Sequence, residues 1–484
     1  MKLNLKGLLI GALFILLGAY FVMAKYTPQK KTKSPAPPEL NSKGFEFKNV
    51  WKFSQKSIGF SSPNLTDLNK DGVKDIIIGS GIFEQGEHER PIMAIDGKKG
   101  TLLWSFKAYS RIFATPFLID INGDHIKDVL IGTDHCHKGP SKICPNLYAL
   151  NGKNGKLLWD LRNINEGSWQ GDVPGFNTIS KFGENILFGQ SGGGFEPRPP
   201  ARLFLAHPKT GKILKEFTPE DKGEVYSIPT LFNHNNKWHA LFGTGGEIVK
   251  GSLYLYDLEK EKALWSLPEK KKGWISSPLV HLKEKFIFAT SVDSGFYKLD
   301  LQGKILWKQK LEGFETFSSP ALGNFDNVPG ADMVITTAKG VWPRHMEENR
   351  VIWMNGKTGK IIDSKTFGLN GYPSPLIFDM NNDGFDEVLV LINLEAKYPA
   401  TFEIAGSMKS AFRIYDGKTR EVLFEKNLDG LAAATPIAQD IDGNGKLDLI
   451  VPVAGKLLRF ELPKKTNSKV YWGKFRGDAG NIIL

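Results

Sequence analysis

The sequence lacks a dense basic run, although its formal net charge is +11. Residues 1–43 hold seven lysines and one acid, Glu39, and so carry +6 of that charge, while the remaining +5 is spread over residues 44–484. Nucleic-acid binding, which depends on clustered basic residues, is therefore not indicated. Apolar residues make up 41% of the chain and charged residues 24%, so a substantial core can form and gross disorder is not expected.

Only one long apolar run is present, and no cysteine follows it, so a lipoprotein anchor is not indicated. Gly7 to Ala24 gives 18 uncharged, mostly apolar residues, just enough to span a bilayer and slightly long for a signal-peptide core. Val22 to Ala24 also fits a small-residue cleavage site. We therefore predict that residues 1–25 are a transmembrane anchor or a signal peptide. Residues 26–44, rich in Pro, Lys and Ser, should form an extended linker.

Cysteine is scarce: Cys136 and Cys144 are the only two, and both lie in the polar segment DHCHKGPSKICP. We predict that they close a small disulfide, which suits an oxidising compartment. Free thiols are one alternative. A metal site with His135 and His137 is another, but four ligands so close together lack the usual paired spacing.

Helical periodicity is also missing from residues 45–484, where a Ser/Thr-Pro-apolar signature recurs instead. Its prolines are Pro63, Pro116, Pro229, Pro278, Pro320, Pro375 and Pro436, and Pro174 fills the one empty slot in the series. These eight prolines lie about 53 residues apart on average, which indicates a repeated structural unit.

Each period also contains an apolar run such as IIIGS, and a hairpin with an Asp/Asn-Gly-Lys turn such as AIDGKKGTLLWSF. Four short strands per period predict one blade of a β-propeller. The repeat gives eight first strands but only seven complete final hairpins. Residues 48–58 resemble the final strand of the first blade, so we predict that they complete the last blade and close the ring. The expected fold is an all-β, eight-bladed propeller of four-stranded blades over residues 45–484.

These motifs resemble known repeat families. The hairpins resemble those of pyrroloquinoline-quinone-type (quinoprotein) propellers, and DLNKDGVKDIIIG is similar to the FG-GAP repeat of integrin α-chain propellers. The tail WGKFRGDAGN is similar to an element seen beside quinoprotein-type repeats. The resemblance covers roughly residues 45–480 and implies the propeller fold more than any one function.

Four acidic nonapeptides each follow the first strand of a blade and precede the second. Oxygen donors at positions 1, 3, 5 and 9, with a backbone carbonyl at position 7, match a loop that wraps a hard cation needing six or more oxygens. Glycine at position 6 permits the sharp turn, and His125 replaces it in the second copy. The predicted ligands are Asp67, Asn69, Asp71, Val73 and Asp75; Asp120, Asn122, Asp124, Ile126 and Asp128; Asp379, Asn381, Asp383, Phe385 and Glu387; and Asp440, Asp442, Asn444, Lys446 and Asp448.

We predict that these loops bind Ca2+ in a structural role, because the ion would neutralise a carboxylate cluster and fix the turn. The alternative is that Asp, Asn and Gly are simply good turn residues, but four copies in the same phase favour the metal. The related segment NFDNVPGAD lacks the acid at position 5, and we expect no tight site there. Extracellular calcium modules bind their ion weakly, and a disulfide suits an oxidising compartment. Together they favour a propeller outside the cytoplasm, in the periplasm or at the cell surface.

The opposite face should bind a partner, because strand direction alternates within a blade and the long loops fall there. These loops are residues 81–91, 134–145, 191–201, 339–350 and 393–410. An aromatic residue before most of the repeated prolines should either pack between blades or contribute to a ligand surface: Phe60, Phe113, Tyr226, Trp274, Phe317 and Tyr372. Candidate polar contacts are Arg90, Arg198, Arg344 and His345.

We expect a non-catalytic scaffold, anchored in a membrane or secreted, that binds a protein or a glycan. An enzyme is the alternative: a calcium-dependent polysaccharide lyase or a quinoprotein-type oxidoreductase. The resemblance implies binding, since FG-GAP propellers mediate protein recognition and one quinoprotein-like family is a scaffold in outer-membrane protein assembly. The vicinal cysteine pair of quinoprotein dehydrogenases and a C-x-x-C-H haem motif are both absent, and no residue stands out as the base of a lyase.

Chelation should lower the thermal stability of the protein, because the carboxylates of each loop would then repel one another. Replacing Asp71 and Asp383 by Ala should remove most of that sensitivity. Melting curves with and without chelator measure both effects. A curve that chelator leaves unchanged would count against calcium in these loops.

Overall fold

The computed structural model describes residues 47–81, 91–133, 145–162, 176–190, 202–328, 330–342, 344–346, 348–395, 408–465, 470–474 and 482–483. These residues form β-strands and the turns between them, and none of them belongs to a helix long and apolar enough to span a bilayer. The predicted anchor or signal segment, the linker, the cysteine pair and Pro174 lie outside the described residues.

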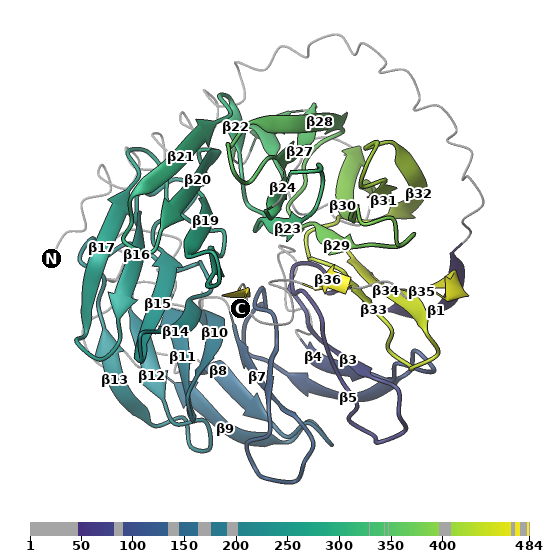
Figure 1. Cartoon of the computed structure of the whole chain (residues 1–484). Helices are drawn as coiled ribbons and strands as arrows, with labels where there is room; N and C mark the ends of the chain where they lie inside the picture. Colours follow the sequence, from purple (N-terminus) through teal and green to yellow (C-terminus); the bar gives the residue numbers. More distant parts are fainter. Residues whose placement is uncertain are drawn as a thin grey trace, which may run out of the picture. The chain divides into compact units, whose positions relative to one another are not determined.

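Eight sheets follow one another around a ring and form the blades of a propeller (Figure 1). Blade 1 contains β2 (Asn64–Thr66), β3 (Asp75–Gly79), β4 (Pro91–Ile95) and β5 (Leu102–Lys107). Blade 2 contains β6 (Phe117–Ile119), β7 (Asp128–Gly132), β8 (Pro145–Leu150) and β9 (Leu157–Arg162). Blade 3 contains β10 (Phe176–Phe182), β11 (Asn185–Gln190), β12 (Leu203–Ala206) and β13 (Ile213–Phe217). Blade 4 contains β14 (Thr230–His234), β15 (Lys237–Gly243), β16 (Ser252–Asp257) and β17 (Lys262–Pro268).

The second half of the chain repeats the pattern. Blade 5 contains β18 (Leu279–His281), β19 (Phe286–Thr290), β20 (Gly295–Asp300) and β21 (Ile305–Lys310). Blade 6 contains β23 (Ala321–Gly323), β24 (Asp332–Thr336), β27 (Asn349–Met354) and β28 (Ile361–Phe367). Blade 7 contains β29 (Leu376–Phe378), β30 (Glu387–Glu395), β31 (Lys409–Tyr415) and β32 (Val422–Asp429). Blade 8 contains β33 (Ile437–Gln439), β34 (Lys446–Val453), β35 (Lys456–Lys465) and β1 (Lys48–Ser54).

Strand β1 closes the ring, because it comes from the start of the propeller and completes its last blade. It pairs antiparallel with β35, with Lys48 opposite Glu461 and Ser54 opposite Lys456. The prediction of an eight-bladed, all-β propeller closed by its N-terminal strand is therefore confirmed for the described residues. Because the ring is closed, the first and last blades pack against each other, and neither is left open at a gap in the ring.

Two additions to the blades were not predicted. A small sheet of β22 (Phe314–Glu315), β25 (Ala338–Val341) and β26 (Arg344–Met346) accompanies blade 6. The C-terminal tail adds β36 (Val470–Trp472) to the inner edge of blade 7 and β37 (Ile482–Ile483) to the inner edge of blade 5. The end of the chain therefore lies among the inner strands, near the centre of the ring (Figure 1).

A β-bulge interrupts the outermost strand of every blade at the same place. In β5 the extra residue is Leu103, and the next residue, Trp104, donates its indole N–H to the carbonyl of Gly152 in blade 2 at 2.7 Å. A Cβ at Gly155 would come within 2.6 Å of this indole, and Gly155 has a φ of +69°, so glycine is required there. The contact recurs between Trp51 and Gly97, Trp159 and Pro208, Trp265 and Leu301, and Trp307 and Gly356.

An ion pair replaces this contact between blades 3 and 4. Lys215 stands at the register of the docking tryptophan, and Glu261 stands at the position of the turn glycine. The Lys215 Nζ lies 2.5 Å from Glu261 Oε1, and both side chains are about half exposed. Such an exposed pair contributes little to stability on its own.

The Ser/Thr-Pro signature forms a hydrogen-bonded belt nearer the centre. The backbone N–H of the residue before one proline donates to the side-chain hydroxyl of the residue before the next proline. The donor–acceptor distances are 2.9 to 3.2 Å along the series Ile228, Ser277, Ser319, Ser374, Thr435 and Ser62. The last link, from Thr435 to Ser62, joins blade 8 to blade 1, so the belt also crosses the closure.

Replacing Trp104 by Ala should destabilise the protein by about 3 to 5 kcal/mol, because a buried indole, its hydrogen bond and its packing on Gly155 are all lost. Leu103→Ala is the matched control: this side chain is adjacent, is 36% exposed, and should cost less than about 1 kcal/mol. Urea unfolding of both variants measures the difference. Equal losses would show that the indole does not hold the two blades together.

Candidate metal centre

The four acidic loops lie on one face of the ring, between the first and second strands of blades 1, 2, 7 and 8. The turns between third and fourth strands share this face, since Asp75 accepts the N–H of Gly97 at 3.0 Å. The chain also enters the propeller here, because Lys48 pairs with Glu461, which in turn pairs with Asp448 at the end of the fourth loop. We call this surface the acidic-loop face.

Within each loop the first acid accepts N–H groups from the turn that follows it. In blade 1, Asp67 Oδ1 accepts the N–H of Lys70 at 2.7 Å, and Oδ2 accepts that of Gly72 at 3.0 Å. Lys70 and Gly72, at positions 4 and 6, have φ values of +61° and +84°. Both positions are left-handed in all four loops, and His125 adopts this conformation with a φ of +63°. The sequence indicated a left-handed backbone conformation at position 6 only.

The acid at position 9 links its loop to the neighbouring turn. Asp75 is fully buried and accepts the N–H groups of Leu68 at 2.8 Å and Gly97 at 3.0 Å. Burial raises the pKa of Asp75 to about 6, although these hydrogen bonds oppose the rise. Asp128 makes the same pair of bonds in blade 2, and so does Asp332 in blade 6, where no tight metal site was expected. This acid therefore has a structural role that needs no metal.

Glu387 differs from these aspartates because its longer side chain leaves one oxygen unpaired. Its Oε2 accepts the N–H of Met380, whereas Oε1, in a fully buried side chain, has no hydrogen-bond partner among the described residues. Asp379 Oδ1, in the same loop, is likewise buried without a partner in that part of the chain. Burial, followed by the charges of Asp379, Asp383 and Asp416, raises the pKa of Glu387 to about 8. The blade 7 loop thus offers buried oxygens that fit a cation.

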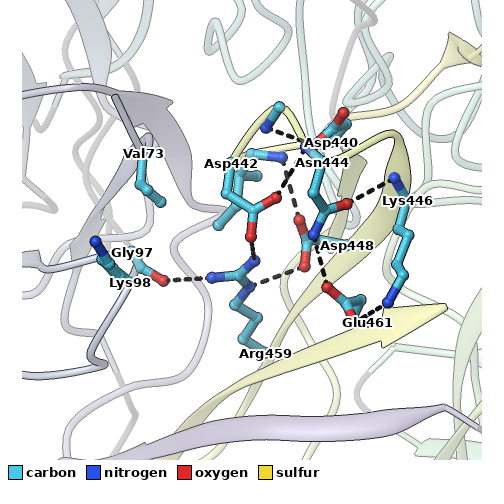
Figure 2. Close-up of polar contacts among 12 residues, drawn as sticks. Val73, Gly97, Lys98, Asp440, Asp442, Asn444, Lys446, Asp448, Arg459 and Glu461 are labelled. Carbon is cyan, nitrogen blue, oxygen red and sulfur yellow. Dashed lines mark hydrogen bonds and ion pairs between the residues drawn. The ribbon is translucent and has the colours of Figure 1, made fainter. Parts of the chain in front are cut away.

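In blade 8 three carboxylates converge: oxygens of Asp440, Asp442 and Asp448 lie within 4.8 Å of one another, the one such group found among the described residues. Arg459, from β35, lies against them (Figure 2). Its Nη2 is 2.6 Å from Asp442 Oδ2 and its Nε is 2.8 Å from Asp448 Oδ1. Its Nη1 donates to the carbonyl of Gly97 in blade 1 at 2.9 Å. A guanidinium is therefore already bound to two of the predicted ligands.

The remaining predicted ligands are less closely grouped. Asp71, Asp124 and Asp383, at position 5 of their loops, are exposed, and each accepts an N–H from its own loop at position 7. Asp416 and Arg459 were not predicted from the sequence, because each comes from another strand or turn of the same blade. Binding of calcium by the twenty predicted residues stays a prediction.

On the opposite face, the aromatic residues before the prolines pack against one another. Phe60 and Phe113, from neighbouring blades, meet edge to face with ring centroids 5.2 Å apart, and Phe317 and Tyr372 do so at 5.5 Å. Trp342 contacts both rings of the second pair. Packing between blades, one of the two roles expected for the six aromatic residues, is therefore observed for these four.

A buried ion pair on this face was not anticipated. Lys272 binds Glu315, and the two side chains are 13% and 2% exposed. Glu315 also accepts the backbone N–H of Trp342 at 2.9 Å, which ties the small sheet to the blade 4–blade 5 connection. Such a pair is costly to break, because removal of one partner leaves a buried charge.

The other candidates predicted for this face are four basic residues. Arg90 and Arg198 lie outside the described residues, as do most of the long loops. Arg344 and His345 form part of β26, for which the backbone alone is described.

The sequence matches no protein-family model and no curated protein sequence. Several solved structures are similar in fold. A europium-containing methanol dehydrogenase is 12% identical, with a TM-score of 0.56 over 86% of this chain and 93% of that one. A quinohemoprotein alcohol dehydrogenase from Comamonas testosteroni is 12% identical, with a TM-score of 0.55 over 86% and 76%. The Dos1 propeller is 12% identical, with a TM-score of 0.50 over 90% and 99%. At such identities the likeness shows the propeller fold alone.

Without metal, stability should fall as the pH rises through the titration of Glu387. Its pKa is about 8 in the folded protein, against an ordinary value of 4.5. Between these values the folded state keeps a proton that the unfolded chain has lost, so the free energy of unfolding declines with pH and levels off above about 8. This group contributes at most about 1.4 kcal/mol per pH unit.

Glu387→Gln should therefore flatten the decline between pH 5 and pH 8, measured by urea unfolding in chelator. Glu461→Gln is the control, because ion pairing and hydrogen bonding hold the pKa of Glu461 below its ordinary value despite its partial burial. If both variants keep the wild-type slope, Glu387 is not the titrating group.

Proposed function

We propose that the protein is a non-catalytic, calcium-stabilised β-propeller that serves as a binding scaffold in the cell envelope. The observation that carries the calcium assignment is the blade 7 loop, where buried oxygens of Asp379 and Glu387 have no hydrogen-bond donor among the described residues. Buried carboxylates without a partner destabilise a protein, and a cation removes that cost. The loop also occurs four times at the same place in its blade, which adds support to the calcium assignment.

Calcium suits these loops better than other metals. The side-chain donors are carboxylate and amide oxygens, which are the ligands of hard cations, and no cysteine or histidine is among the predicted ligands. Each loop has potential oxygen donors at positions 1, 3, 5, 7 and 9, which suits the high coordination number of calcium. When bound, the ion would fix the acidic-loop face and lower its charge.

A binding role agrees with the architecture. The contacts between neighbouring blades make a rigid ring, and rigid rings commonly present binding residues on their loops. We assign partner binding to the face opposite the acidic loops, which carries Trp342 and the Lys272–Glu315 pair. The long loops are expected on the same face from the alternation of strand direction. The fold does not decide between scaffold and enzyme, because propellers of similar architecture serve different functions. The proposed location is extracytoplasmic, with residues 1–25 acting as anchor or export signal.

Two variants, one at a tryptophan and one at a leucine, test the assignment of the partner face. Trp342→Ala should reduce capture of a protein or glycan ligand from envelope extracts at least several-fold, because large aromatic residues contribute most to binding surfaces. Leu306→Ala, on the outer rim and 51% exposed, should leave capture unchanged.

Melting curves must first show that both variants are folded. The assignment of the face would be wrong if Leu306→Ala reduced capture and Trp342→Ala did not. Turnover of an alcohol or of an acidic polysaccharide by the wild-type protein would contradict the non-catalytic role.

A further inference from the structure

Arg459 forms ion pairs with two of the three carboxylates that converge in the fourth acidic loop. The inference drawn from it rests on the proposed function, in which the other acidic loops bind calcium. We propose that the Arg459 guanidinium is the permanent cation of blade 8, so that this loop binds no calcium. Calcium is then confined to the loops of blades 1, 2 and 7.

The guanidinium is held by all three of its nitrogens. Nε and Nη2 form ion pairs with Asp448 and Asp442, Nη1 reaches the carbonyl of Gly97, and the side chain is only 3% exposed (Figure 2). A guanidinium stays charged at every pH at which a protein folds, so it does not leave by losing its proton. A calcium ion bound to the same oxygens would lie beside a fixed positive charge.

The predicted ligand at position 5 of this loop also has partners. Asn444, at position 5, donates its amide to Glu461 Oε2 at 2.8 Å, and its own oxygen accepts the N–H of Lys446 at 2.7 Å. The Lys446 Nζ lies 2.9 Å from Glu461 Oε1, which places a second base beside the loop (Figure 2). The side-chain ligands of this loop are therefore paired without an ion.

Among the described residues, the other acidic loops have no base at this position. Arg459 pairs with Ile450, two residues after the position 9 acid. At the same register, blades 1, 2 and 7 have Ala94, Ala149 and Ile414. An alanine or an isoleucine supplies no positive charge, so no side chain at this register neutralises the carboxylates of those three loops.

Blade 5 shows what a base at this register does when no acidic loop is present. Lys298 stands there, and its Nζ donates to the carbonyl of Gly356 in the next blade at 2.8 Å. Arg459 makes the equivalent contact with Gly97. The seam contact thus explains a base at this register in general, whereas the two ion pairs are specific to Arg459.

Removal of calcium should leave the contact between blade 8 and blade 1 intact. Gly97 accepts hydrogen bonds from both Arg459 and Trp51, and neither bond involves a metal. Chelation would then loosen turns in blades 1, 2 and 7 without separating blade 8 from blade 1.

The test is the number of calcium ions bound per chain. The full-length protein would be stripped of metal in detergent and dialysed against calcium, and bound calcium would be measured by elemental analysis. Arg459→Met should bind one more calcium ion per chain than the wild type, because the three converging carboxylates lose their counter-ion. Lys298→Met, the matched control at the same register, should bind the wild-type number.

A second variant keeps the test decisive if Arg459→Met does not fold. Asp442→Asn, with Arg459 in place, should leave the wild-type number unchanged. A loss of one ion from Asp442→Asn, or no gain by a folded Arg459→Met, would overturn the inference. A wild type that binds no calcium, beside an Arg459→Met variant that binds one ion, would refute the proposed function and support the role of Arg459.

Discussion

The contact between each blade and the next is the interaction on which the rest of the structure depends. A four-stranded sheet cannot cover both of its faces, so each blade is stable only against its neighbours. Near the centre, the N–H before each proline binds a hydroxyl of the following blade, from Ile228 round to Ser62. Proline restricts the residue before it to extended conformations, which aims that N–H consistently. At the rim, a bulged strand and an indole also link neighbouring blades, as Trp104 links blade 1 to Gly152 of blade 2.

Most of the fold could be predicted because its signals are local and repeated. The proline series gave the period, the hairpin turns gave the strands, and the missing eighth hairpin pointed to residues 48–58. The partners in the blade contacts could not be predicted, because each lies about one period away, as Trp104 and Gly152 do, 48 residues apart. The strands β36 and β37 were also missed, since two or three residues carry no recognisable strand pattern.

The acidic loops show the same division between local and distant information. Spacing within nine residues predicted the turn, including the left-handed position taken by His125. It also suggested one role for every position 9 acid, whereas the structure distinguishes them. Asp75 binds two N–H groups and Asp128 binds three. Glu387 keeps an oxygen without a partner among the described residues, and Asp448 binds Arg459. These differences depend on side-chain length and on a neighbouring strand, and the spacing of a nine-residue motif contains neither.

Strand β1 imposes an order on how the ring can be made. Its partner, β35, begins at Lys456, so the first strand to be synthesised waits for almost the whole chain before it can pair. Until then both ends of the growing array carry unpaired edges, which are the parts of a sheet most prone to associate with other chains. Contacts so distant in sequence also form slowly, because a very long loop must close first. A chain that crosses a membrane unfolded and assembles in one step afterwards would avoid that exposed interval, and circular permutants cut between other blades would shift it.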